Sequence, residues 1–243
     1  MLTRGKAQAA ERPRRFYTTA EAALSDAGFQ VRLDGRPVRT PGGNPLLLPT
    51  RALAEIIAAE WAAQQEHIAF AAMPATKLAF TAIDGVGASR EAVARETARY
   101  AGSDLVCYFA EGPQDLVQAE LSGWAPLLDW AETSLGLRLD RVSGIIHREQ
   151  PAEAVELVRE LALRGSDFEL TGLAAAASLF GSAVLALALQ RGRLSADEAF
   201  DLSRLDEAYQ EARWGVDAEA AERTALLRIE ARALQAWLEA LAG

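Results

Sequence analysis

Three carboxylates and a tryptophan near the C-terminal end are the side chains of this chain best suited to function. Glu207, Glu211 and Trp214 are spaced at i, i+4 and i+7, and Asp206 directly precedes them. On a helix of about 3.6 residues per turn, this spacing places the three on one side. Paired carboxylates can perform acid–base chemistry where their environments separate their pKa values. Carboxylates around an aromatic side chain also suit the binding of a basic protein partner.

The exposure of Trp214 decides between two interpretations of this helix. The opposite, core-facing stripe consists of Leu202, Leu205, Tyr209 and Ala212. If no other element covers Glu207 and Trp214, an aromatic side chain left in water indicates partner contact. If a second helix packs over them, Trp214 is an ordinary core residue.

A second candidate for chemistry is the pair Cys107 and His147, a thiol and an imidazole that could form a nucleophilic unit. However, Cys107 lies in the apolar run Asp104–Phe109, where a free cysteine is usually a small buried hydrophobic residue. The histidines, His67 and His147, lie far apart, and neither has a second metal ligand at helical or hairpin spacing. The sequence contains neither a phosphate-binding loop nor a complete nucleophile-elbow motif.

Composition narrows the function classes further. The 243 residues are half hydrophobic, about a quarter charged, and carry a net charge of −9. This charge argues against duplex nucleic acid and anionic membranes as partners. The single cysteine excludes an intrachain disulfide and indicates a reducing compartment. Residues 1–15 are basic and lack the apolar core of a secretory signal, which leaves a basic tail or the remnant of a transit peptide.

The N-terminal part is predicted to contain strands. Phe29–Leu33 alternates apolar and polar residues, Asp34-Gly35 is a two-residue hairpin signal, and Arg36–Thr40 forms the returning strand. Pro37 places that strand at an edge or a bulge. Arg36 either binds a partner or covers the surface of the sheet with its aliphatic stem.

Helices are expected to follow this hairpin. Leu46–Leu48 is a candidate third strand, Thr50 is positioned to cap a helix, and Pro74 opens a shorter helix through Ile83. The glycine-rich segment Asp84–Ala88 is the best candidate for a break in the chain. We therefore expect a small N-terminal α+β domain over residues 1–85 and a larger multihelical domain over residues 86–243.

The second domain is predicted to be almost entirely helical. A helical pattern begins after Ser89, which is predicted to be a helix cap, and Leu137–Val142 alternates briefly like a strand. Further helices are predicted over residues 116–135, with interruptions near Gly123 and Pro126, and over residues 152–163, 172–190, 196–214 and 218–241. Ser195 and Glu198 form a capping box at the start of the fourth of these segments.

The uncharged segment Gly172–Leu189 has two interpretations. Its 18 residues reach the short limit for crossing about 30 Å of hydrocarbon. Eleven of them are alanine, serine or glycine, and no aromatic belt flanks the segment. A helix that is apolar on all sides is also typical of the centre of a helical domain. We expect the buried helix.

An ordered set of motifs resembles the assembly chaperone family that handles the α subunit of the ATP synthase F1 sector. The motifs are Asp34–Pro41, Glu60-Trp61, Met73-Pro74, Thr81–Asp84, Ser103–Tyr108, Leu170–Leu173, Leu205–Glu211 and Trp214-Gly215. They follow one another from about Phe16 to Gly215, which is nearly the whole chain.

The resemblance implies an N-terminal α+β domain, a C-terminal helical bundle, and no enzymatic activity. It also implies no nucleotide, metal or other cofactor and no small-molecule ligand. Family members hold the newly made α subunit until the β subunit replaces them. A glutamate of the late acidic helix is functionally important in the family and corresponds here to Glu211 or Glu207. A bacterial member would work in the cytoplasm, and a eukaryotic one in the mitochondrial matrix.

We therefore expect client contact through Asp206, Glu207, Glu211, Trp214 and Arg36. Two rival functions belong to other classes. One is a small-molecule enzyme that uses Cys107, His147 or the C-terminal carboxylates. The other is a membrane-associated assembly factor that inserts Gly172–Leu189.

Overall fold

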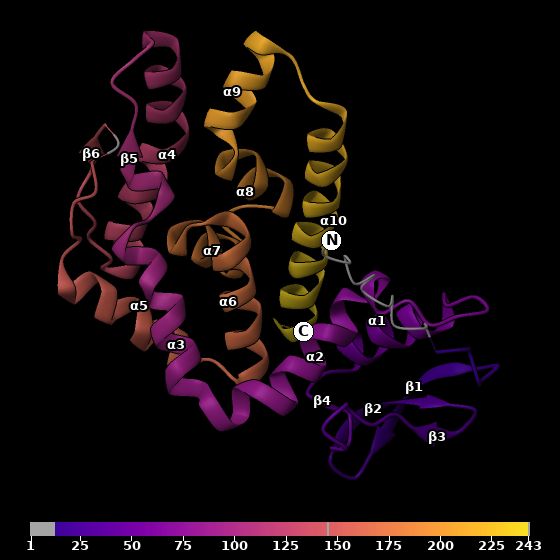
Figure 1. Cartoon of the computed structure of the whole chain (residues 1–243). Helices are drawn as coiled ribbons and strands as arrows, with labels where there is room; N and C mark the ends of the chain where they lie inside the picture. Colours follow the sequence, from indigo (N-terminus) through magenta and orange to yellow (C-terminus); the bar gives the residue numbers. More distant parts are fainter. Residues whose placement is uncertain (1–12, 145, 243) are drawn as a thin grey trace, which may run out of the picture.

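The computed structural model of this chain describes residues 13–144 and 146–242. A small antiparallel sheet covered by a helix lies at one end of the molecule, and helices form most of the remainder (Figure 1). The expected α+β fold class is confirmed. Most of the basic N-terminal stretch falls in residues 1–12, outside the described residues.

The sheet is built around β2. Its strands are β1 (Ala20–Ser25), β2 (Gly28–Leu33), β3 (Arg36–Pro37) and β4 (Leu47–Leu48). Strand β2 pairs with β1 along one edge and with both β3 and β4 along the other, always antiparallel. Strand β1 was not predicted from the sequence because half of its residues are alanine, which is depleted in strands.

The hairpin between β2 and β3 is confirmed. Leu33 pairs with Arg36, so Asp34 and Gly35 form a two-residue turn, and both have positive φ, 47° and 77°. This conformation suits the twist of the flanking strands. The proline of the short β3 strand lies at an edge of the sheet, as expected.

Helix α1 (Arg51–Ala62) covers the sheet. Its cap is Thr50, whose hydroxyl accepts a hydrogen bond from the Leu53 amide at 3.2 Å. The carboxylate of Glu60, near the end of α1, accepts hydrogen bonds from the amides of Ala75 and Thr76 at 2.7 and 2.8 Å. Glu60 thereby caps the start of α2 (Pro74–Thr81), which follows the short helix η1 (Phe70–Ala72).

The break predicted at Asp84–Ala88 is wrong, because the chain stays helical there. A π-helical turn, η2 (Ala82–Val86), leads directly into α3 (Gly87–Gly102). The Asp84 carboxylate accepts hydrogen bonds from Thr40, Asn44 and the Gly42 amide, and these lower its pKa, Thr40 most strongly. Tertiary contacts therefore hold this glycine-rich segment.

Ser89 also differs from its predicted role as a cap. It lies at a kink inside α3 with φ −138° and ψ 26°. Its hydroxyl donates to the Gly85 carbonyl at 2.6 Å, back toward the preceding turn. A serine that hydrogen-bonds four residues back bends a helix instead of starting one.

A short two-stranded element and a long helix follow. After η3 (Leu105–Cys107), β5 (Tyr108–Phe109) pairs in parallel with β6 (Val142–Ser143). The strand predicted over residues 137–142 is wrong except at its last residue. Helix α4 (Gln114–Leu135) runs without interruption through Gly123 and Pro126.

Two helices predicted as single elements are each divided. The segment 172–190 belongs to α6 (Asp167–Phe180) and α7 (Ala183–Gln190), separated by Gly181 in the left-handed region with φ 64°. The segment 196–214 forms α8 (Ala196–Ser203) and α9 (Leu205–Trp214), separated by Arg204. The two remaining helices are α5 (Ala152–Arg164) and α10 (Ala218–Ala242).

The segment with two interpretations, Gly172–Leu189, lies inside the helical part. Seven of the eight α7 residues are buried, and α7 sits at the centre of the bundle (Figure 1). Ser182 caps it by accepting a hydrogen bond from the Leu185 amide at 3.0 Å. No helix in the described ranges is both long and apolar enough to cross a membrane.

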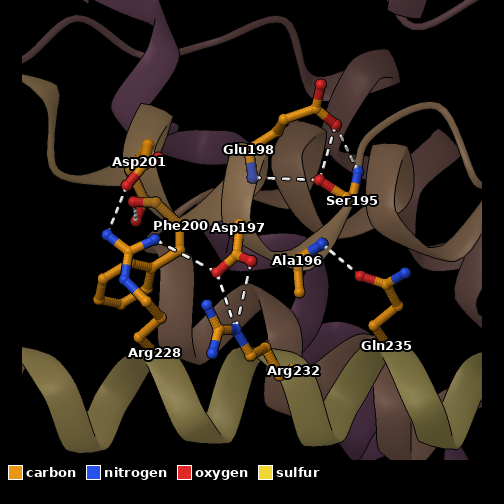
Figure 2. A network of polar contacts seen from close by, with 10 residues as sticks. Ser195, Ala196, Asp197, Glu198, Phe200, Asp201, Arg228, Arg232 and Gln235 are labelled. Atoms are coloured by element: carbon orange, nitrogen blue, oxygen red, sulfur yellow. Dashed lines mark hydrogen bonds and ion pairs between the residues drawn. The ribbon is translucent and has the colours of Figure 1, made fainter.

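A polar network fastens α8 to α10. Arg228 and Arg232 extend from α10 to Asp197, and Arg228 also pairs with Asp201 at 2.6 Å (Figure 2). The Gln235 side chain accepts the Ala196 amide at 2.6 Å. The predicted capping box of Ser195 and Glu198 is confirmed. These contacts fix the base from which α9 projects.

Candidate functional site

Helix α9 carries four of the five predicted binding residues, and it has no buried residue. Trp214, at its C-terminal end, is 77% exposed, and Glu207 is also exposed. Asp206 and Glu211 are half-buried. We refer to these four residues as the α9 surface. Because no element of the described residues covers Trp214, the alternative of a tryptophan packed under a second helix is wrong.

The stripe expected to face the core is less buried than predicted. Leu202, Leu205 and Tyr209 are half-buried and Ala212 is exposed. The end of α8 and the start of α9 nevertheless pack on α4 because Gly123 has no side chain. A Cβ at Gly123 would lie 2.8 Å from Leu202 Cδ2 and 3.3 Å from Leu205 Cδ1. The Trp124 indole also donates to the Leu202 carbonyl at 3.0 Å.

A polar contact with the start of α4 positions α9. The Tyr209 hydroxyl donates to Asp115 Oδ1 at 2.6 Å, and the Arg213 guanidinium pairs with the other oxygen of Asp115. The Arg213 guanidinium also lies 4.5 Å from the centre of the Tyr209 ring. The Tyr209 hydrogen bond, followed by Arg213, lowers the pKa of Asp115. The carboxylate is therefore held in its charged form.

The two glutamates of the α9 surface differ in their partners. Glu211 forms an ion pair with Arg204 at 3.1 Å, and both side chains are about a quarter to a third exposed. In the part of the chain that the structure describes, Glu207 has neither a hydrogen-bond nor an ion-pair partner. Glu207 is therefore the more available of the two for an external cation.

Two hollows flank α9, and Asp206 lines both. The first has a volume of about 500 Å³ and includes Pro113, Leu116 and Trp214 in its lining. The second has a volume of about 430 Å³ and lies next to Glu120 and His147. The α9 surface is thus bordered by concave regions on the side that faces α4.

Arg36, the fifth predicted contact residue, lies elsewhere. It is exposed at the start of β3, in the sheet at the opposite end of the molecule from α9 (Figure 1). With Phe16 and Trp61 it lines a hollow of about 610 Å³. The structure therefore does not bring Arg36 together with the α9 surface.

Cys107 and His147 do not have the properties of a nucleophilic pair. Cys107 is fully buried, and this burial raises the pKa of its thiol, whereas a nucleophilic cysteine requires a lowered pKa. His147 Nδ1 lies 3.1 Å from the Tyr108 hydroxyl. Across residues 13–144 and 146–242, no group of three or more histidine, cysteine or acidic side chains could hold a metal ion.

Several functional candidates in this region were not predicted from the sequence. Asp115, which anchors α9, is 94 residues away from Tyr209, and no local pattern connects them. Glu120 is buried on α4, and here a signal existed. It lies four residues after Leu116 and four before Trp124, which places a carboxylate within an apolar stripe. Further exposed apolar residues follow α9 in the chain: Val216 lies just after it, and Leu226 and Ile229 lie on α10.

Comparisons with known proteins give a consistent result. A family model described as ATP12 chaperone protein matches residues 14–132. The mitochondrial protein atp12 of Schizosaccharomyces pombe is 26% identical over 218 residues, covering 83% of this chain and 74% of that protein.

Solved structures of bacterial proteins are more similar. The crystal structure of Atp12 from Paracoccus denitrificans is 41% identical with a TM-score of 0.88, covering 94% of this chain and 98% of that chain. A putative chaperone from Agrobacterium tumefaciens is 42% identical with a TM-score of 0.89, covering 94% of this chain and 86% of that one. The resemblance found in the sequence is confirmed, and the chain belongs to the ATP12 chaperone family.

Proposed function

We propose that this chain is an ATP synthase assembly chaperone that binds the unassembled α subunit of the F1 sector through the α9 surface. In this proposal the chain prevents aggregation of the α subunit until the β subunit replaces it. The bacterial relatives support action in a bacterial cytoplasm, and the relative from fission yeast supports the mitochondrial matrix for a eukaryotic protein.

The single observation that supports this proposal best is the exposed Trp214. An unassembled subunit exposes apolar surface meant for its neighbour, and such surface promotes aggregation. Tryptophan supplies a large apolar anchor, and the surrounding carboxylates of Asp206 and Glu207 favour basic groups on the client while disfavouring association with acidic surfaces. Because α9 has no buried residue, its side chains can change partners without disturbing the core.

The test measures the dissociation constant between the purified chain and unassembled α subunit. Trp214→Ala should weaken binding at least about tenfold, because a central aromatic anchor is removed. Glu207→Lys should also weaken binding, with a larger effect at low salt. Glu211→Lys should also weaken binding, but it breaks the ion pair with Arg204 as well. Glu211→Gln, which removes the charge of Glu211 without reversing it, is therefore measured beside Glu211→Lys.

Matched controls lie on β1. Leu24→Ala removes another exposed apolar side chain, and Glu21→Lys reverses another exposed charge. Both should bind as the wild type does. Equal binding by Trp214→Ala and Glu207→Lys, with both variants folded, would remove the α9 surface from the proposal.

Arg36 is proposed as a separate client contact at the sheet end. Because it is exposed and distant from α9, it can reach only a client that extends along the molecule. Arg36→Gln should therefore weaken binding independently of Trp214→Ala, so that the two free-energy changes add. Unchanged binding by Arg36→Gln would restrict the client contact to α9.

A further inference from the structure

Glu120 is a buried carboxylate with an unusual environment. Its side chain is only 2% exposed, yet its one hydrogen bond from the described residues comes from the Ala110 amide, at 2.7 Å. No arginine, lysine or histidine of the described ranges forms an ion pair with it. Burial raises the pKa of Glu120, and the negative charge of Asp206 raises it further. A buried carboxylate without a cation is costly to the fold.

This carboxylate lies at the wall of the second hollow beside α9. The hollow has a volume of about 430 Å³, and we call it the Glu120 hollow. Its lining residues are Ser103, Leu105, Tyr108, Glu120, Trp124, His147, Gly181 and Asp206. Neither arginine nor lysine belongs to this lining. Two carboxylates therefore line a partly apolar space together with one histidine, His147, whose ring nitrogen contacts the Tyr108 hydroxyl.

These features fit an organic cation with several hydrogen-bond donors. A metal ion would need a set of ligands that the described residues do not provide. A guanidinium group has five N–H donors, is more weakly hydrated than an ammonium group and tolerates apolar walls. It could donate to Glu120 and Asp206 together while Leu105 and Trp124 enclose it.

We propose that the Glu120 hollow binds the guanidinium group of an arginine side chain of the client protein. This inference rests on the proposed function, because the client that covers α9 is the protein positioned to supply the arginine. Asp206 connects the two sites, since it belongs to the α9 surface and also lines the hollow.

Glu120 should have opposite effects on client binding and on folding. In the free chain the pKa of Glu120 is raised. Its favourable contribution to the free energy of unfolding is therefore complete only below the pKa of Glu120 in the unfolded chain, and it is lost as pH rises through the pKa in the folded chain. At neutral pH its charge therefore opposes folding. Glu120→Gln removes this charge and retains an oxygen for the Ala110 amide. The variant should keep or raise the melting temperature while losing affinity for the client.

The experiment measures thermal unfolding and α-subunit binding on the same preparations. Glu120→Gln and Asp206→Asn should each weaken binding at least about tenfold. Glu132→Gln is the control, because it makes the same chemical change at an exposed glutamate of α4 that pairs with Arg138. This control should bind and unfold as the wild type does.

A double-mutant cycle identifies the partner group. Arginines of the α subunit are replaced by glutamine one at a time, and each is measured against wild type and Glu120→Gln. One of them should weaken binding to the wild type but have no further effect on Glu120→Gln.

Three results would each overturn this inference without affecting the proposed function. They are a Glu120→Gln variant that binds the α subunit as tightly as the wild type, a Glu120→Gln variant whose melting temperature falls together with its affinity, and the absence of a coupled arginine. Failure of the wild-type chain to bind the α subunit would instead overturn the proposed function. The proposed binding of a client arginine would then be overturned as well.

Discussion

Helices α7 and α9 are both short, but they have opposite relations to the core. Seven of the eight residues of α7 are buried, whereas none of the ten residues of α9 is buried. The sequence of α7 is apolar on all sides, and that of α9 combines one apolar stripe with charged residues. The difference indicates that α7 supplies stability, while α9 presents side chains whose removal costs the fold little.

The contacts that hold the two helices differ in the same way. The first turn of α7 is fixed from inside, because Ser182 caps it and the buried Asp104 carboxylate accepts the Val184 amide at 3.0 Å. Helix α9 is held from outside, through the exposed contact between Tyr209 and Asp115 and through the α8–α10 network (Figure 2). Interactions exposed to water are weaker and easier to rearrange.

The largest difference expected between α7 and α9 follows from creating a cavity in α7. Leu187 is fully buried, so Leu187→Ala should lower the free energy of unfolding by about 3 kcal/mol, measured by urea denaturation. The control is Leu226→Ala on α10, where the side chain is exposed and the loss should be below about 0.5 kcal/mol. Similar losses in both variants would contradict the contrast between buried and exposed side chains.

The second effect concerns pH. Burial raises the pKa of Asp104 to about 6, from 3.8. Its contribution to stability should therefore be complete below pH 3.8 and decline as pH rises to about 6, by up to about 1.4 kcal/mol per unit. Asp104→Asn, which cannot ionise, should lack this decline when unfolding is followed across that range.

Asp197 provides the control of opposite sign. Its hydrogen bond from Arg232, more than any other contact, lowers its pKa, so its contribution is present above the unfolded pKa and is lost as pH falls. The wild type should lose stability as pH falls through the pKa of Asp197, and Asp197→Asn should lack this loss. Identical pH profiles for wild type, Asp104→Asn and Asp197→Asn would contradict both assignments.

A smaller effect should be confined to α9. Tyr209→Phe removes the hydroxyl that donates to Asp115 and should cost about 1 kcal/mol or less in the free energy of unfolding. Amide hydrogen exchange should become faster in α9 while α7 stays protected. Tyr100→Phe on α3 is the control and should leave both helices unchanged. Faster exchange throughout the bundle would show that α9 supports the core.

The smallest effect on stability is expected at Trp214. Because this side chain is 77% exposed, Trp214→Ala should change the free energy of unfolding by less than about 0.5 kcal/mol, although it should impair client binding. Trp237 is fully buried on α10, and Trp237→Ala should cost about 3–5 kcal/mol. Comparable destabilisation by the two substitutions would place Trp214 in the packed structure.

Local features of the fold were readable from the sequence. The Asp34-Gly35 turn, the Thr50 cap and the capping box at Ser195 each depend on residues within four positions, so they could be predicted. The division at Gly181 was missed because the apolar run continues through it, although a glycine followed by a capping serine marks such a junction. Strand β1 was missed because only its pairing with β2 makes it a strand.

The candidate site also combines features that the sequence predicted with features that depend on tertiary contacts. The spacing of Glu207, Glu211 and Trp214 predicted a common side of a helix, but it could not reveal that Glu211 pairs with Arg204. Asp115 and Glu120 approach α9 from a helix about ninety residues earlier in the chain. Their part in the site depends on how α4 packs against α9.

By itself the sequence determined the local conformations, the amphipathic pattern of α9 and the family of the chain. Only the tertiary structure decided that Trp214 faces water, that α7 is enclosed, and that Glu120 and Asp206 line one hollow. The physical reason is that caps and turns depend on neighbouring residues, whereas the exposure of a side chain depends on which distant elements cover it.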